Sequence, residues 1–165
     1  MFCLWQPEHF SSIVSQIDWE HRIAPESSVA TYIEQGFLVP INLGVDGAFQ
    51  FLVRARGGEF SLSERESRYV AVTSDPYLLI AHGSVVLGGL DAIGVDLDLE
   101  ELTIPLAPGR HAVTIHLVDW SAEPGSMLED GEPGANALPD FIVEIRPESS
   151  GVVFRTSVET FDRPE

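Results

Sequence analysis

The chain has 165 residues, and 26 acidic residues against 9 basic ones give it a formal net charge of −17 at pH 7. All nine basic residues are arginine. This charge argues against direct nucleic-acid binding and against adhesion to anionic membranes, because both depend on cations that meet phosphate groups. Hydrophobic residues make up 44% of the chain, so it can bury a core despite its acidity, and its length predicts one domain.

The first residues bear on where the protein is expected to reside. Residues 1–7 lack the basic and apolar regions of a signal peptide, and no apolar run approaches the roughly 18 residues that a membrane helix needs. Cys3 is the only cysteine, so we expect no disulfide within the chain and a solvent-exposed thiol near the terminus. These features predict a cytoplasmic protein of a bacterium-like cell, without a membrane segment.

The first third of the chain predicts short helices. Apolar residues between Phe10 and Trp19 fit one face of a helix that follows Pro7, but they also fit the alternation of a strand, and the pattern leaves both open. A second helix is clearer, because Ser27 or Ser28 can cap its start and Gly36 can end it.

From residue 37 onward the pattern is that of short strands. We predict strands at residues 37–43, 48–56, 68–73, 77–82, 85–87, 102–106, 110–120, 140–146 and 152–154. Glycine and proline separate them and no βαβ alternation occurs, so the fold class is mainly β: an antiparallel β-sandwich of about eight strands with one or two short N-terminal helices. Residues 1–147 form this domain, and residues 148–165 form a C-terminal strand and tail.

Two connections in the β region stand out. Pro108 and Gly109 predict a tight turn that joins the strands 102–106 and 110–120 as a hairpin. Residues 121–138 show no periodicity and predict a long loop, which is either functional or mobile.

Motifs for catalysis or metal binding are absent from the sequence. His111 and His116 are five residues apart in one predicted strand, so His111 belongs to the core face and His116 to the outer face, with Arg110. The chain contains no His-x-His, no His-Glu-x-x-His and no Gly-x-Ser-x-Gly. We therefore expect no catalytic residue, no metal site and no cofactor.

Charge is distributed unevenly along the chain. Between residues 91 and 132 there are ten acidic residues and one arginine, whereas four arginines gather at Arg54, Arg56, Arg65 and Arg68. If their strands form a hairpin, Arg54, Arg56 and Arg68 face outward and pair with Glu59, Glu64 and Glu66. The acidic region either steers a basic partner or is a solvated surface that keeps the protein in solution.

Several short motifs follow one another in a familiar order: Trp5-Gln6-Pro7, Gln35-Gly36-Phe37, Asp46-Gly47-Ala48 and Leu106-Ala107-Pro108-Gly109-Arg110. In this order the chain resembles the competence protein J family over residues 4–146. The loop at residues 121–138 and the stretch after Pro147 depart from the family's pattern. The family includes a competence-associated inhibitor of a DNA-entry nuclease, so the resemblance implies a nuclease inhibitor, without assigning roles to individual residues.

The leading hypothesis is a non-enzymatic domain that binds a basic protein partner, a nuclease or toxin, as an inhibitor or immunity-type protein. Carboxylates can occupy a cleft that binds phosphates, and Trp120 can serve as an aromatic anchor. The candidate contacts are Asp96, Asp98, Glu100, Glu101, Trp120, Glu129, Asp130 and Glu132.

The alternative is a module that binds a small molecule or a carbohydrate. Its candidate ligand residues are His82, Arg110 and His116 in a pocket at one end of the sandwich, or else the arginines that gather between residues 54 and 68. A third hypothesis is a metal-dependent enzyme, which would require stoichiometric metal in the purified protein. The oligomeric state is left open by the sequence.

Overall fold

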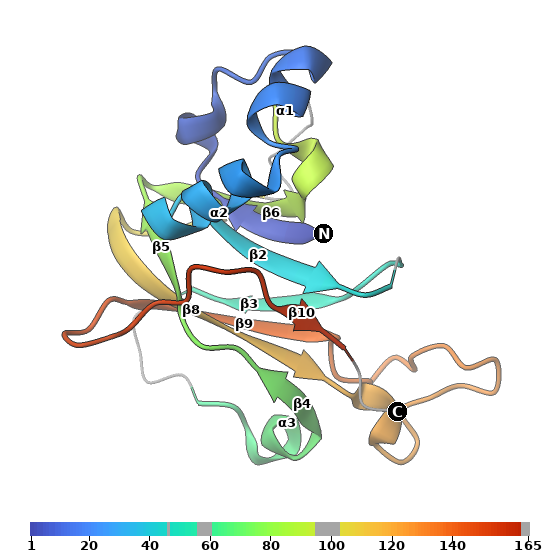
Figure 1. The fold of residues 1–165 in the computed structure, drawn as a ribbon. Helices are drawn as coiled ribbons and strands as arrows, with labels where there is room; N and C mark the ends of the chain where they lie inside the picture. Colours follow the sequence, from blue (N-terminus) through green and yellow to red (C-terminus); the bar gives the residue numbers. More distant parts are fainter. Residues whose placement is uncertain (46, 56–60, 95–102, 163–165) are drawn as a thin grey trace.

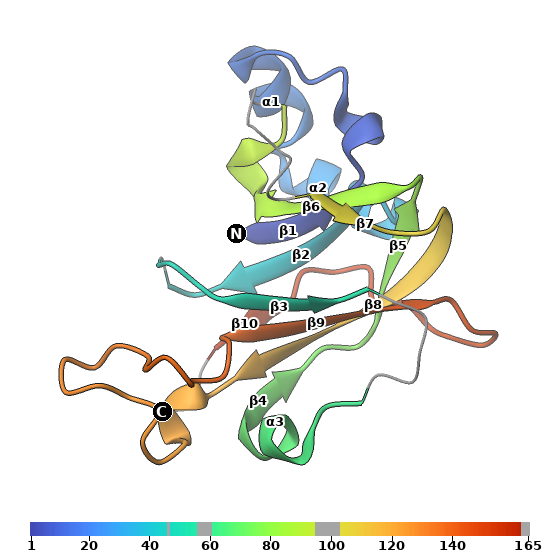
Figure 2. The same cartoon turned by 180° about the vertical axis from the view of Figure 1, so that it is seen from behind.

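The structure is a computed structural model that describes residues 1–45, 47–55, 61–94 and 103–162. Within these residues, ten strands form two five-stranded sheets, and few helices accompany them (Figures 1 and 2). The predicted mainly β class with a sandwich-like arrangement is confirmed. Of the described helices, none is long and apolar enough to cross a membrane.

The first sheet contains the N-terminal strand at its centre. Its spatial order is β10 (Thr160–Phe161), β2 (Leu38–Leu43), β1 (Phe2–Trp5), β6 (Ser84–Gly89) and β7 (Thr103–Pro105). The second sheet is built around the longest strand. Its order is β3 (Phe51–Arg54), β9 (Phe141–Pro147), β8 (Gly109–Val118) and β4 (Val70–Thr73), and β5 (Tyr77–Ala81) pairs with the first half of β8.

Both sheets are mixed rather than purely antiparallel. β3 runs parallel to β9, and β10 runs parallel to β2, whereas the other described pairs are antiparallel. Each parallel pair joins strands that are distant in sequence, so no turn motif between them could reveal the direction.

The two sheets share one hydrophobic core. In β8 the residues Val113, Ile115 and Leu117 are at most 1% exposed, and His111 lies on the same face at 5%. Their alternation places them against the other sheet, as the period of two predicts. A second, smaller cluster lies around Val118 and Ile142.

The predicted hairpin at Pro108 and Gly109 is wrong. β7 pairs with β6 in the first sheet, whereas β8 pairs in the second, so the turn carries the chain from one sheet to the other. The N–H of Leu106 donates to the carbonyl of Gly83 at 3.0 Å, which keeps the chain along the first sheet up to the crossing. Gly109, with φ at +139°, begins the new strand there.

The N-terminal helices cover one end of the first sheet. Residues 10–19 form neither the single helix nor the strand that the pattern left open: Pro7–Phe10 form the 3₁₀ helix η1, residues 11–15 lie outside a helix, and α1 spans Gln16–Arg22. Val14 and Ile17, which the helical pattern placed on the apolar face, are exposed. In α2 (Glu26–Gln35) the N-cap is Pro25 rather than a serine. Gly36 ends α2 as predicted, with φ at +77°, and a Cβ there would lie 2.7 Å from Cγ of Leu78.

Three further helices are short. They are α3 (Glu64–Tyr69), η2 (Leu90–Ala92) and η3 (Trp120–Ala122). The predicted strand at 68–73 is therefore shorter, since its first two residues belong to α3. The side chain of Ser63 accepts from the N–H of Glu66 and Glu66 accepts from the N–H of Ser63, a capping box that starts this helix.

Cys3 is buried, contrary to the expectation of an exposed terminal thiol. It lies in β1 opposite Pro40 and Gly88, with no exposed surface. Burial raises the pKa of its thiol far above the ordinary value, because the thiolate would lose its hydration. Cys3 therefore packs in the core as a small apolar side chain.

Candidate functional site

The candidate partner-binding residues divide into two groups. Asp96, Asp98, Glu100 and Glu101 lie outside the described residues. Trp120, Glu129, Asp130 and Glu132 lie in η3 and the loop after it, and the structure brings them to one end of the second sheet (Figures 1 and 2).

Part of this loop is a small projecting hairpin, which we call the acidic tongue (residues 126–134). Met127 bridges to Pro133, the N–H of Leu128 donates to the carbonyl of Glu132 at 2.8 Å, and that of Gly134 donates to Ser126 at 2.7 Å. In Figures 1 and 2 the segment extends away from the sheets, drawn in orange. The tongue thus has internal hydrogen bonds although its sequence shows no strand period.

One buried hydroxyl and several exposed polar contacts hold the base of the tongue. The hydroxyl of Ser126, which is 5% exposed, donates to the carbonyl of Trp120, with oxygens 2.6 Å apart. Arg65 of α3 donates to both carboxylate oxygens of Glu123, at 2.6 and 2.7 Å, and to the carbonyl of Asn136. The bond to Arg65 lowers the pKa of Glu123 below its ordinary value. α3 and the loop are therefore tied to each other.

The outer part of the tongue combines apolar and acidic side chains. Met127 and Leu128 are each 53% exposed. Glu129, Asp130 and Glu132 follow within four residues and are also exposed. Exposed apolar side chains bordered by charge are typical of surfaces that bind other proteins.

A cavity of about 340 Å³ lies beside the tongue. It is lined by Ala48, Phe49, Gln50, Trp120, Gly131, Glu132, Pro133 and Asp140. The indole N–H of Trp120 donates to Oδ1 of Asp140 at 2.8 Å, and the backbone N–H of Gln50 donates to Oδ2 at 2.8 Å. Trp120 is only 7% exposed, so it forms a wall of this cavity rather than a projecting anchor.

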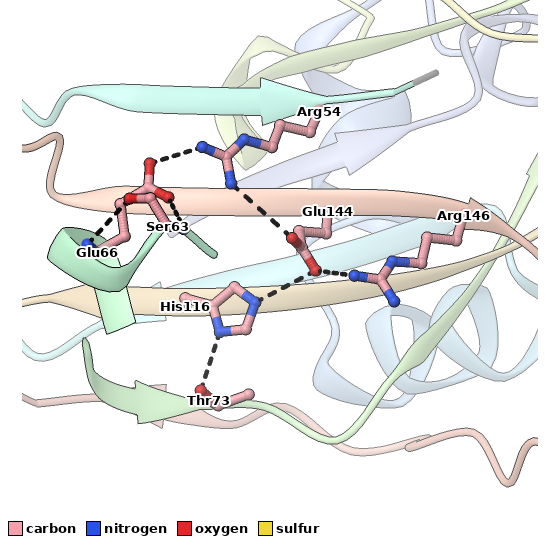
Figure 3. A network of polar contacts seen from close by, with 7 residues as sticks. All are labelled: Arg54, Ser63, Glu66, Thr73, His116, Glu144 and Arg146. Carbon is pink, nitrogen blue, oxygen red and sulfur yellow. Dashed lines mark hydrogen bonds and ion pairs between the residues drawn. The ribbon is translucent and has the colours of Figure 1, made fainter. Parts of the chain in front are cut away.

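A buried polar network lies across the outer face of the second sheet (Figure 3). Glu144 of β9 is at its centre and is 5% exposed. Its Oε2 accepts from Arg146 at 2.7 Å, and its Oε1 is 4.0 Å from the guanidinium of Arg54, its neighbour in β3. Arg54 also pairs with Glu66 of α3 at 2.6 Å. The network therefore joins β3, β9 and α3.

His116 extends this network to the far edge of the sheet. Its Nδ1 is 2.9 Å from the hydroxyl of Thr73, and its Nε2 is 3.7 Å from Oε2 of Glu144 (Figure 3). Burial lowers the pKa of His116 below the ordinary value, and this outweighs the opposing attraction of Glu144. A neutral imidazole with its proton on Nε2 fits both contacts, because Nδ1 then accepts from the hydroxyl.

In enzymes, this order of hydroxyl, imidazole and carboxylate can activate the hydroxyl as a nucleophile, because the imidazole accepts its proton. Here Glu144 contacts two arginines, and Glu144 and His116 are only 5% and 6% exposed, so a substrate has little access to them. We therefore assign the network a structural role. His116 thus lies on the predicted outer face of β8 but is buried there.

The candidate ligand residues of the alternative hypothesis do not form one site. His82 pairs with Glu8 at 3.2 Å, and Arg110 pairs with Glu148 at 2.6 Å. His116 is six residues further along β8 than Arg110, a separation of roughly 20 Å in a strand. Among the described residues, no three His, Cys, Asp or Glu side chains gather closely enough to hold a metal ion.

The predicted arginine-bearing hairpin is also wrong. β3 pairs with β9, and β4 pairs with β8, so two strands separate Arg54 from the strand that follows Arg68. The predicted pairing with glutamates is confirmed for Arg54 with Glu66 and for Arg68 with Glu64. Arg56 and Glu59 lie outside the described residues.

The sequence contains signals for two features that the predictions above leave out: helix α3 and the buried Glu144. Ser63 and Glu66 have the spacing of a capping box, which predicts α3. Glu144 interrupts the apolar run Phe141–Ile145, and a charge in such a run indicates a buried partner.

Comparison with known proteins gives limited matches. No family model matches the chain. Two curated proteins of Xylella fastidiosa, from strains 9a5c and Temecula1 and named as CutC family proteins, are 40% identical over 81 residues, which is 48% of this chain. The matched region spans only 30% of the length of these relatives.

One solved structure, named crocagin biosynthetic gene J, has a similar fold. It aligns with a TM-score of 0.56 and 17% sequence identity, over 90% of both chains. These comparisons correct the resemblance to the competence protein J family, since the matches name a CutC family protein and a crocagin biosynthetic protein instead. The motifs behind that resemblance are turn and cap sequences, which unrelated folds share.

Proposed function

We propose that this chain is a non-enzymatic domain that binds a basic protein through the acidic tongue. One observation carries the proposal: a projecting, internally hydrogen-bonded hairpin exposes Met127 and Leu128 beside three carboxylates. A basic nuclease or toxin is the class of partner that this charge suits, and the proposal includes a cytoplasmic location.

The two kinds of side chain on the tongue serve different steps of binding. The carboxylates of Glu129, Asp130 and Glu132 attract a basic surface and raise the association rate. Met127 and Leu128 lose water when covered and so slow dissociation. The contact between Arg65 and Glu123 ties the loop that bears the tongue to α3, and the buried hydroxyl of Ser126 holds the base of the tongue, which reduces the entropy lost on binding.

The cavity beside the tongue supports the same partner. Phe49 and Trp120 offer aromatic walls, and Glu132 brings a carboxylate to the rim. A partner's arginine or lysine can lay its aliphatic stem against these rings and its charge near Glu132. In this arrangement Trp120 contacts the partner as part of the cavity wall and does not project from the surface.

Affinity capture from native cells at rising salt tests the proposal with a matched pair of variants. The tongue variant carries Glu129→Gln, Asp130→Asn and Glu132→Gln. The control carries Glu20→Gln, Glu26→Gln and Glu34→Gln, which remove the same charge from exposed positions of α1 and α2.

The proposal predicts a basic protein that the original chain and the control retain at low salt and release at high salt. The tongue variant should fail to retain this basic protein even at low salt. Equal retention by both variants, or equal loss from both, would show that the tongue is not the binding surface.

A further inference from the structure

A second cavity shares Phe49 with the cavity beside the tongue and otherwise has its own lining residues. It measures about 490 Å³ and is lined by residues of β1, α1, β2 and η2 and by Val45 and Phe49. In Figures 1 and 2 the N-terminus, the end of β2 and η2 lie on the same side of the first sheet. A volume of this size suits a small organic molecule, since such sites run from about 300 to 1,000 Å³.

Three aromatic side chains, Phe2, Trp19 and Phe49, contribute to the walls of this cavity and are held by contacts within the chain. The rings of Phe2 and Phe49 meet edge to face, with centroids 6.0 Å apart. The indole N–H of Trp19 donates to the carbonyl of Leu90 at 3.1 Å, which ties α1 to η2. Val45, at the rim, is 68% exposed. Contacts within the chain therefore hold the three aromatic side chains of the cavity.

The charged side chain of the cavity is acidic. Asp91 of η2 lines it, and no arginine or histidine is among its lining residues in the described part of the chain. Aromatic faces attract cations, and the net charge of −17 raises the concentration of cations near the whole surface. The aromatic rings, the carboxylate of Asp91 and the overall charge favour a cationic ligand, against the opposing charge of the α-ammonium group of Met1, which also lines the cavity.

We propose that this cavity binds a small organic cation with an apolar body, such as an aryl-alkyl amine. The apolar body lies against Phe2, Trp19 and Phe49, and the ammonium group meets the carboxylate of Asp91. This site differs from the small-molecule site expected at His82, Arg110 and His116, and it goes beyond binding of a protein by the tongue.

Calorimetric titration with three probes that share an indole ring tests the proposal: tryptamine, 3-methylindole and indole-3-propionate. Tryptamine should bind most tightly, the neutral 3-methylindole more weakly, and the anionic propionate least. Asp91→Asn should lower the affinity for tryptamine about fivefold and leave that for 3-methylindole unchanged. Phe49→Ala should weaken both.

Two controls make the outcome specific. Glu34→Gln removes one charge from an exposed position of α2 that does not line the cavity, and it should leave tryptamine binding unchanged. The tongue variant should also bind tryptamine normally. No heat of binding from tryptamine, equal affinities for tryptamine and indole-3-propionate, or an unchanged probe preference in Asp91→Asn would overturn the proposal.

Discussion

Glu144 is the residue on which the outer face of the second sheet depends. It is nearly buried and contacts Arg54, Arg146 and His116. A buried carboxylate is stabilising only while its cations remain, and removing one partner leaves the others uncompensated.

Glu144→Gln should therefore lower the free energy of unfolding by about 2 kcal/mol, less than for a fully buried pair because Arg146 is half exposed. Urea unfolding measures this loss. The control is Glu64→Gln, which removes the exposed partner of Arg68 and should change stability far less. Similar losses in the two variants would contradict a special role for Glu144.

His116 makes the stability depend on pH. Its folded pKa lies below the ordinary value near 6.5, so the unfolded chain binds the proton first as the pH falls. Stability should be complete above about pH 7.5 and should fall as the pH drops through about 6.5 toward the folded pKa. His9 contributes in the same direction, because burial and Arg22 lower its pKa too.

Thermal unfolding of the original chain and of His116→Gln, measured over this pH range, separates the two histidines. The variant should show a smaller loss of stability on acidification, with the remainder due to His9. Carboxyl groups with lowered pKa values, such as Glu123 and Glu148, titrate at lower pH and do not interfere. An unchanged pH slope in the variant would refute the assignment.

At the scale of elements, the tongue depends on one buried hydroxyl at its base. Ser126→Ala removes the bonds to Trp120 and Glu123 and should cost about 1 kcal/mol. Hydrogen exchange should become faster in residues 126–134, while β8 and β9 keep their protection. Uniformly faster exchange across the chain would mean that the tongue is not a separate unit.

The end of α2 depends on Gly36. Gly36→Ala places a Cβ 2.7 Å from Leu78 in a left-handed conformation, so we expect a loss of about 2 kcal/mol or more. Chemical unfolding measures it, and Gly125→Ala provides the comparison, since Gly125 also has a positive φ but no atom within 4 Å of the added Cβ. A loss no larger in Gly36→Ala than in Gly125→Ala would show that contact with Leu78 costs nothing.

How much of each element the sequence could predict depends on how local its cause is. The core face of β8 follows from alternation within ten residues, so the burial of Val113, Ile115 and Leu117 was readable. The partner of β7 was not, because Pro108 and Gly109 serve a hairpin and a crossing between sheets equally well. The burial of His116 depends on Thr73 and Glu144, which the sequence does not connect.

At the scale of the whole molecule, the arginines are used internally. Six of the described arginines pair with carboxylates: Arg54, Arg65, Arg68, Arg110, Arg146 and Arg155. The separate basic stripe suggested by the sequence therefore does not exist among the described residues. The excess acidic charge faces solvent instead, and the tongue carries part of it beside exposed apolar side chains.

The acidic tongue as the protein-binding surface is the central claim, and photo-crosslinking tests it most directly. A photoreactive phenylalanine analogue replaces Leu128 in one variant and Val14, which is 76% exposed, in the control. After irradiation in native cells, the variant at Leu128 should form one discrete adduct with a basic protein, and the control should form none. No adduct at Leu128, or the same adducts from both positions, would contradict the claim.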